Sequence, residues 1–203
     1  MCNLFSKIGC LLLLSILFNA CNTNLSPVEP DKIDIVPPED VLAINNVLNR
    51  WREGYEIEDI ETYMRAYWSE GFRYVGDMGT EGDKTDDTEF DDIREERDAA
   101  NKVFSEFQDI NIQLSSRPEI SIDMDKTRTE VRTHYRIQGS VAAGELFQGE
   151  YTGWYAEGDN LFIFEKRDGE WRIVEWYDEA YKTEEILIEN EPLLPIVWST
   201  LKQ

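Results

Sequence analysis

The chain has 203 residues, with 42 acidic side chains against 20 basic ones, which gives a formal net charge of −22. A surface this negative repels phosphate backbones and anionic lipid headgroups. We therefore expect no binding to nucleic acid and no electrostatic attachment to a membrane. The length suits one domain with its own core and short flanking segments.

Residues 1–20 have the composition of a secretion signal. Lys7 precedes the apolar run 8–18, which is shorter than a membrane-spanning helix requires, and a small residue directly precedes Cys21. Residues 17–21 resemble the bacterial lipobox, in which signal peptidase cleaves before a cysteine that becomes lipidated. The resemblance implies a lipoprotein that is anchored in the cell envelope through a lipid on Cys21 and faces the periplasm or the exterior.

Residues 21–38 are predicted to be a tether between the lipid and the folded part. Four prolines and several acids interrupt any helical period in this stretch, and such a segment is extended. All three cysteines lie in the leader or at its end, so the domain after Cys21 has none for an internal disulfide. We expect this domain to span residues 39–180, with a tail over 181–203.

Three helices are predicted at the start of the domain. The first begins at Pro38 with acids in its first turn, and its apolar residues recur at three- and four-residue spacing. The second begins after Asp59, a plausible N-cap, and ends at Gly71. The third covers about 90–107, and Arg97 interrupts its apolar stripe. The apolar positions of the first helix are Val41, Ile44, Val47, Leu48, Trp51 and Tyr55.

From Ile110 onward the hydrophobic period changes from that of a helix to that of a strand. Turn residues separate the segments, including those at Gly158 and Gly169. The predicted strands, after a short one at 72–75, cover 110–116, 119–124, 128–138, 145–157, 160–167 and 170–177.

This order of elements resembles the nuclear transport factor 2-like fold, and most closely its SnoaL-like branch, over residues 39–178. The likeness is carried by Trp51 and Tyr55 at the end of the first helix, by Asp59-Ile60-Glu61 and by Asp168-Gly-Glu-Trp-Arg-Ile173. It implies an α+β cone in which three N-terminal helices pack in a strongly bent antiparallel sheet around a cavity. The fold serves both enzymes and non-catalytic binding modules.

Enzymatic members of this superfamily place an Asp or a His with tyrosines in the cavity. His134 alternates with charged residues on its strand, which predicts a position on the outer face. On the last strand, Glu175 and Tyr177 share a face with Trp171 and Ile173, and in related families the latter two point inward. Alternation therefore predicts Glu175 and Tyr177 in the cavity.

A buried carboxylate needs a partner, and Arg97 on the third helix is the best candidate. The pair is either a structural ion pair or a functional site in which Glu175 is a general base and Tyr74 or Tyr177 donates a hydrogen bond. The remaining aromatic candidates are core residues by default, although a cavity lined by them suits an apolar or ring-bearing ligand. The complete candidate pocket is Trp51, Tyr55, Tyr63, Tyr74, Arg97, Glu175 and Tyr177.

Two segments stay open. The acidic loop 77–92 does not have the ligand spacing of an EF-hand, so we expect a solvated loop and no metal site or cofactor. The apolar tail 181–203 has three alternatives, which are to cover the cavity mouth, to dock on the outer face of the sheet, or to meet a second subunit, as in a homodimer.

Two functions remain in view. The first is a non-catalytic module that binds a small apolar molecule or a protein partner at the envelope. The second is a cofactor-independent isomerase, dehydratase or cyclase that acts on a small apolar substrate in the cone. The lack of a predicted inward His or Asp favours the first.

Overall fold

The computed structural model describes residues 38–77, 85–115, 119–122, 127–183 and 193–203. The predicted signal peptide, Cys21 and the tether lie outside these ranges. Within the described part no helix is long and apolar enough to cross a membrane.

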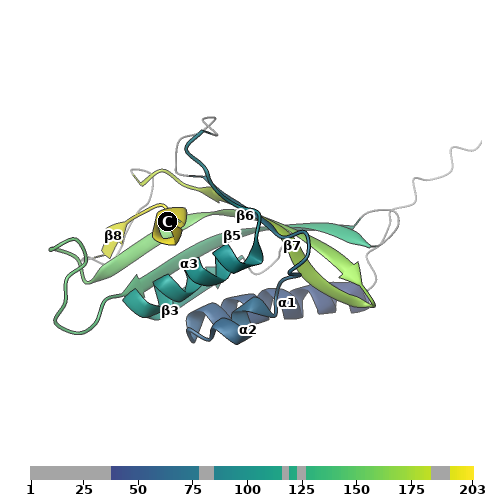
Figure 1. Ribbon diagram of the computed structural model, residues 1–203, viewed down its shortest axis with the longest axis horizontal. Helices are drawn as coiled ribbons and strands as arrows, with labels where there is room; N and C mark the ends of the chain where they lie inside the picture. Colours follow the sequence, from purple (N-terminus) through teal and green to yellow (C-terminus); the bar gives the residue numbers. More distant parts are fainter. Residues whose placement is uncertain (1–37, 78–84, 116–118, 123–126, 184–192) are drawn as a thin grey trace, which may run out of the picture. The chain divides into compact units, whose positions relative to one another are not determined.

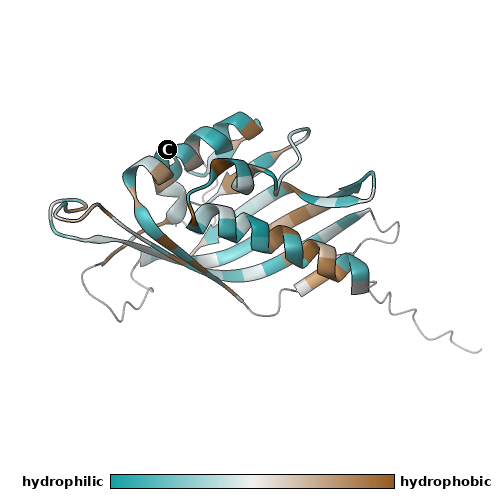
Figure 2. Cartoon of the chain, turned by 90° about the horizontal axis from the view of Figure 1, so that it is seen from below, coloured by the Kyte–Doolittle hydropathy of each residue, from teal (hydrophilic) through white to brown (hydrophobic). Residues whose placement is uncertain are grey.

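Three helices form near the predicted places, although the second ends at Met64, well before the predicted end at Gly71. They are α1 (Pro38–Glu56), α2 (Ile60–Met64) and α3 (Ile93–Glu106), and apolar positions alternate with polar ones along them (Figure 2). Asp59 caps α2 as predicted, because its side chain accepts a hydrogen bond of 3.0 Å from the backbone N–H of Glu61.

The third helix begins later than predicted. Its N-cap is Asp92, whose carboxylate accepts from the backbone N–H of Arg94 at 2.9 Å. The preceding residues are extended because they form β2 (Thr88–Phe90), which pairs antiparallel with β1 (Arg73–Gly76). A strand pairing thus replaces the predicted first turn of the helix.

One sheet contains the strands of the described residues, in the order β2-β1-β7-β6-β5-β3, with β4 beside β5 and β8 beside β6. Most neighbours are antiparallel as predicted, but β1 runs parallel to β7 and β8 runs parallel to β6. The curled sheet has the three helices on one side (Figure 1). The remaining strands are β3 (Gln108–Leu114), β4 (Glu119–Ile122), β5 (Arg128–Ser140), β6 (Gly153–Arg167), β7 (Glu170–Ala180) and β8 (Leu193–Pro195).

Strand β6 replaces two predicted strands. The sequence Gly158-Asp-Asn predicts a turn, but β6 continues through it and pairs with β5 and β7 on its two sides. A Cβ on Gly158 would lie 2.5 Å from the carbonyl oxygen of Glu179 and 2.8 Å from the hydroxyl of Tyr135. Glycine is needed here for close approach of neighbouring strands and not for a turn.

The tail returns to the domain. After β8, a five-residue 3-10 helix, η2 (Trp198–Lys202), packs against α3 near the C-terminus, which Figure 1 marks. Its buried residues join a core built largely from aromatic side chains. The position of η2 decides what fills the cone.

Candidate functional site

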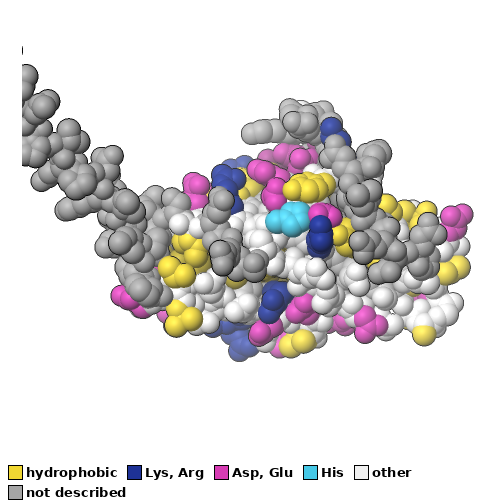
Figure 3. Space-filling view, turned by 180° about the vertical axis from the view of Figure 1, so that it is seen from behind, with side chains coloured by type: hydrophobic (Ala, Val, Ile, Leu, Met, Phe, Trp, Pro, Cys, Tyr) yellow, Lys and Arg dark blue, Asp and Glu magenta, His cyan; other side chains and the backbone are white. Residues whose placement is uncertain are grey.

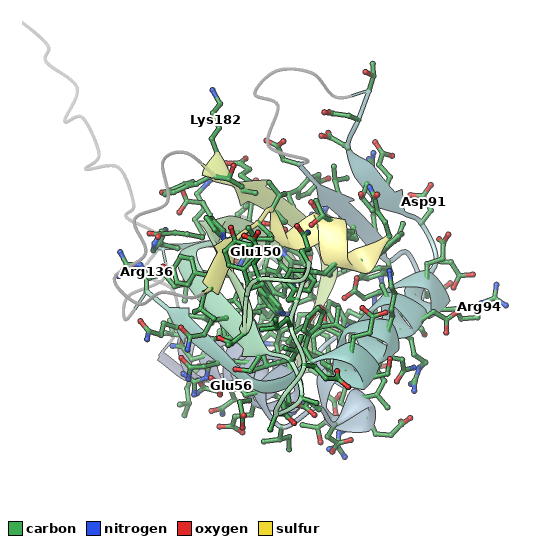
Figure 4. All side chains as sticks on the ribbon, turned by 90° about the vertical axis from the view of Figure 1, so that its left-hand side faces the viewer. Glu56, Asp91, Arg94, Arg136, Glu150 and Lys182 are labelled. Carbon is green, nitrogen blue, oxygen red and sulfur yellow. The ribbon has the colours of Figure 1, made fainter. Side chains whose placement is uncertain are left out.

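The predicted aromatic residues lie together inside the cone. Trp51 and Tyr55 from α1, Tyr63 from α2 and Tyr74 from β1 are fully buried. The ring centroids of Tyr55 and Tyr63 are 5.1 Å apart, and those of Trp51 and Tyr63 are 6.4 Å apart. These four side chains point inward as predicted and form part of a dense aromatic cluster. Figure 4 shows that the charged side chain of Arg94 points away from the interior.

The C-terminal tail contributes a central ring to this aromatic cluster. Trp198 is fully buried, and its ring centroid lies 5.2 Å from that of Trp176, 5.3 Å from Tyr135 and 5.4 Å from Tyr55. Its Nε1 donates a hydrogen bond of 3.2 Å to the hydroxyl of Tyr55. Among the three alternatives for the tail, its described residues 193–203 agree with the first, because Trp198 packs inside the cone.

A β-bulge in β7 reverses the predicted side-chain alternation. Ile163 and Phe164 are consecutive in β6, yet they pair with Glu175 and Ile173, so Val174 has no opposite residue. One extra residue turns every later side chain of the strand to the other face. The sequence signal of this bulge is the pair of adjacent apolar residues Ile173 and Val174, both of which are buried.

The predicted inward positions of Glu175 and Tyr177 are therefore wrong. Trp176 and Asp178 are the buried residues of this stretch. Glu175 pairs with Arg128 and accepts a hydrogen bond of 2.6 Å from the hydroxyl of Tyr177. This group is part of the outer face of the sheet.

The predicted pair of Arg97 and Glu175 is also wrong. Arg97 Nη1 lies 2.6 Å from Glu61 Oε1 at the protein surface. The charge on the buried face of α3 is Glu96, which shares that face with Val103. The spacing of Glu96 from Ala100 and Val103 is helical, and this pattern could have identified it.

Glu96 forms a fully buried ion pair with Lys202 of the tail. Lys202 Nζ lies 2.8 and 2.9 Å from the two carboxylate oxygens. The hydroxyl of Tyr63 donates to Glu96 at 2.5 Å, that of Tyr67 donates to Tyr63 at 2.7 Å, and Trp51 Nε1 donates to Tyr67 at 2.7 Å. Burial lowers the pKa of Lys202, and the Glu96 carboxylate opposes that effect.

Asp178 is a second buried carboxylate, which the predicted alternation missed. It accepts hydrogen bonds from the hydroxyls of Tyr135 at 2.7 Å and Tyr74 at 3.4 Å. Burial raises the pKa of Asp178 to about 6, although both hydroxyls and the charge of Lys202 act in the opposite direction. An acid that titrates near neutral pH between two tyrosines has the properties of a proton acceptor.

This pKa gives a prediction for stability. Because the folded-state pKa exceeds the unfolded value of 3.8, the contribution of Asp178 to stability is complete below pH 4 and is lost as the pH rises through 6. Asparagine mimics the protonated acid. The stability of Asp178→Asn relative to wild type should therefore rise by about 2 kcal/mol between pH 4 and pH 7.

Urea unfolding at both pH values measures this change. The exposed neighbour Glu179 provides the control, because Glu179→Gln removes one negative charge without touching either tyrosine. If the stability difference between Asp178→Asn and wild type does not vary with pH, the pKa of Asp178 is not raised in the folded protein.

The amide of Asn160 lies on the inward side of β6. Its Oδ1 accepts a hydrogen bond of 2.7 Å from Trp176 Nε1, but its Nδ2 has no hydrogen-bond partner among the residues that the structure describes. Asn160 pairs across the sheet with Asp178, so the two polar groups are neighbours on one wall of the cone. Most buried donors in proteins are paired, so this amide is an exception within the polar part of the wall.

His134 lies on the outer face of the sheet, as predicted. Its Nδ1 is 3.1 Å from Asp159 Oδ1 and its Nε2 is 2.9 Å from Glu157 Oε1. Figure 3 shows this histidine among acidic and basic side chains. It borders a hollow of about 380 Å³ whose other lining residues include Arg132 and Glu179. These contacts support a structural role in joining β5 and β6.

The acidic loop is described only in part, since residues 78–84 lie outside the described ranges. Residues 88–90 form β2 and Asp92 caps α3. No group of three or more His, Cys, Asp or Glu side chains suited to a metal ion occurs among the residues that the structure describes.

No protein-family model matches the sequence, and no curated protein matches it. Several solved structures, however, have a similar fold. A nuclear transport factor 2-like superfamily protein from Salmonella enterica serovar Typhimurium aligns with a TM-score of 0.55 and 11% identity, over 74% of this chain and 99% of the other. The chain has the nuclear transport factor 2-like fold.

Other solved structures with this likeness bear the names of enzymes. A putative scytalone dehydratase from Novosphingobium aromaticivorans aligns at 10% identity with a TM-score of 0.57, over 74% of this chain and 90% of that one. A hexachlorocyclohexane dehydrochlorinase, LinA Type2, aligns at 11% identity with a TM-score of 0.53, over 76% and 96% of the two chains. Identities this low establish a shared fold, and the fold does not determine the activity.

Proposed function

We propose that this chain is an envelope-anchored lipoprotein whose nuclear transport factor 2-like domain is a non-catalytic binding module for a small apolar molecule or a protein partner. The insertion of η2 into the cone carries this proposal. Trp198 and Lys202 occupy the region that a substrate would need, and both are buried there. A site whose interior is held by the tail suits reversible binding better than repeated turnover.

Analysis of bound compounds tests the binding function. Full-length protein extracted from membranes in mild detergent is incubated with apolar ring compounds, separated from free compound, and analysed by mass spectrometry. We expect retained compounds to be released chemically unchanged and in a fixed ratio to protein. Release of a converted product would contradict the non-catalytic function.

The anchor has a separate test. Metabolic labelling with a clickable fatty acid should tag the wild-type protein, because the lipobox resemblance places the acyl-bearing cysteine at position 21. Cys21→Ser should remain unlabelled and be released or unprocessed. Cys10→Ser, which changes a cysteine within the leader, is the matched control and should label normally. Equal labelling of Cys21→Ser and wild type would exclude lipid attachment at this residue.

A cofactor-independent isomerase, dehydratase or cyclase is the second candidate, and Asp178 is the observation that favours it. The carboxylate with its two tyrosine donors resembles the acid–base groups of enzymatic members of the superfamily, and structural neighbours include proteins named as a dehydratase and a dehydrochlorinase. Such an enzyme would use Asp178 as the base and a tyrosine hydroxyl as the donor to a carbonyl oxygen.

Deuterium incorporation into a panel of small ring ketones in heavy water distinguishes the two functions. Proton abstraction next to the carbonyl would exchange that hydrogen, and Asp178→Asn would reduce the rate at least 100-fold. The binding function predicts no exchange above that of Asp178→Asn. Exchange that requires Asp178 would establish the enzyme.

A further inference from the structure

The ammonium group of Lys202 lies in an aromatic cage inside the cone. Its Nζ is 3.7 Å from the ring centroid of Trp176, 4.0 Å from that of Tyr74 and 5.4 Å from that of Trp198. The Glu96 carboxylate completes the surroundings of the cation. Aromatic faces together with a carboxylate are the groups with which proteins bind organic ammonium ions.

Most of this cage belongs to the domain and not to the tail. Tyr74 is on β1, Trp176 is on β7, and these two residues are opposite each other in the parallel strand pair. Glu96 is on α3, where the hydroxyl of Tyr63 orients its carboxylate. If η2 leaves the cone, only Trp198 leaves the cage with it.

The ring of Trp198 occupies a second position next to the cation. Rings from α1, β5 and β7 surround it, and the contacts to Tyr55 and Trp51 are edge-to-face. Edge-to-face contacts accept any aromatic ring of suitable size. The tail therefore presents to the cone one ring and one ammonium group, which lie four residues apart in one short helix.

Besides the contacts of Trp198 and Lys202, hydrogen bonds of polar side chains attach η2 and the residue after it to the domain. Ser199 Oγ donates to the carbonyl oxygen of Asp77 at 2.8 Å, and Gln203 Nε2 donates to Thr88 Oγ1 at 3.0 Å. Lys102 bonds to the carbonyl oxygen of Gln203. Because η2 contains no residue of β1 to β8, it can leave the cone without moving a strand.

The charge left behind determines which compound can replace the tail. The carboxylates of Glu96 and Asp178 both lie inside the cone, and without Lys202 the carboxylate of Glu96 loses its paired cation. A neutral or anionic compound would leave Glu96 uncompensated, which is costly in a buried site, whereas a cation restores the pair.

We propose that the interior of the cone is a binding site for an organic ammonium ion attached to an aromatic ring, and that Trp198 and Lys202 are its built-in occupants. This rests on the proposed binding function and names the ligand class. An external ligand of this kind competes with the tail and releases η2 from the cone.

The test uses full-length protein and two probes of similar size, 2-phenylethylammonium and 3-phenylpropionate. Calorimetric titration of the wild type should show binding of the ammonium probe and no binding of the carboxylate probe. Hydrogen–deuterium exchange should rise at least tenfold in residues 196–203 when the ammonium probe is added. Without such a rise, the probe does not displace the tail and the proposal is wrong.

Variants provide a second measurement. Trp198→Ala together with Lys202→Ala empties both positions, so the ammonium probe should bind at least tenfold more tightly than to wild type. The exposed Lys182 supplies the matched control, since Lys182→Ala also removes one lysine and should bind as wild type does. Adding Glu96→Gln to the double variant should remove the preference for the cation. If the double variant does not fold, the calorimetric titration and the hydrogen–deuterium exchange of the wild type decide whether the proposal holds.

Neutral ethylbenzene separates this inference from the proposed function. Equal binding of ethylbenzene and the ammonium probe would overturn the ammonium preference and leave the small-molecule binding function intact. Conversion of any probe would instead contradict the non-catalytic function.

Discussion

Replacement of Lys202 by methionine should lower the free energy of unfolding by about 3–5 kcal/mol, the range found when one partner of a buried ion pair is removed. Methionine retains an apolar side chain inside the ring cage, so the loss arises mainly from the Glu96 carboxylate, which stays buried without its cation. Glu96→Gln should cost a similar amount because it leaves the ammonium group uncompensated. Urea unfolding at pH 7 measures both losses.

The double variant shows whether the two residues interact. Glu96→Gln with Lys202→Met should lose clearly less than the sum of the single losses, because neither charge then remains buried alone. Arg97→Met is the control on the same helix, and its pair with the exposed Glu61 should contribute at most about 1 kcal/mol. Additive losses, or single variants that are nearly neutral, would contradict the buried pair.

Replacement of Trp198 by alanine should lower the free energy of unfolding by about 3–5 kcal/mol, as expected for a large buried aromatic side chain. The change removes ring contacts with Trp51, Tyr55, Tyr135 and Trp176 and leaves a space between elements that are far apart in sequence. Thermal and urea unfolding measure the loss.

Two further variants test the position of this ring. Trp198→Phe keeps an aromatic side chain in the cluster and should lose clearly less stability than alanine. Leu146→Ala removes a side chain that is 56% exposed and should change stability by less than about 0.5 kcal/mol. A loss for Trp198→Ala as small as that for Leu146→Ala would mean that the tail contributes nothing to the core.

Local sequence patterns predicted most of the elements. The apolar spacing of α1, the cap at Asp59 and the alternation of β5 each depend on residues close together in the chain, and all three predictions are confirmed. The order of those elements was sufficient to indicate the fold. The inward aromatic residues Trp51 and Tyr55 followed from the same helical period.

The errors arose where the conformation depends on a partner distant in sequence. Gly158 predicts a turn by itself, and only the neighbouring strands show that it permits close approach within β6. The start of α3 moved because residues 88–90 pair with β1. Strand pairing overrode local preference in both cases.

The sequence by itself therefore determined the elements, their order and the aromatic character of the interior, because periodicity and capping are local properties. Only the tertiary structure decided which charged groups are inside. The extra residue in β7 places the carboxylate of Asp178 inside the cone and that of Glu175 on the outer face. The packing of η2 against α3 makes Glu96 and Lys202 a buried ion pair. Local spacing gave a signal for each residue position, in the adjacent apolar residues Ile173 and Val174 and in the helical spacing of Glu96 from Val103, but not the partners. A bulge is defined by the opposite strand, and the place of the tail depends on its packing against the cone.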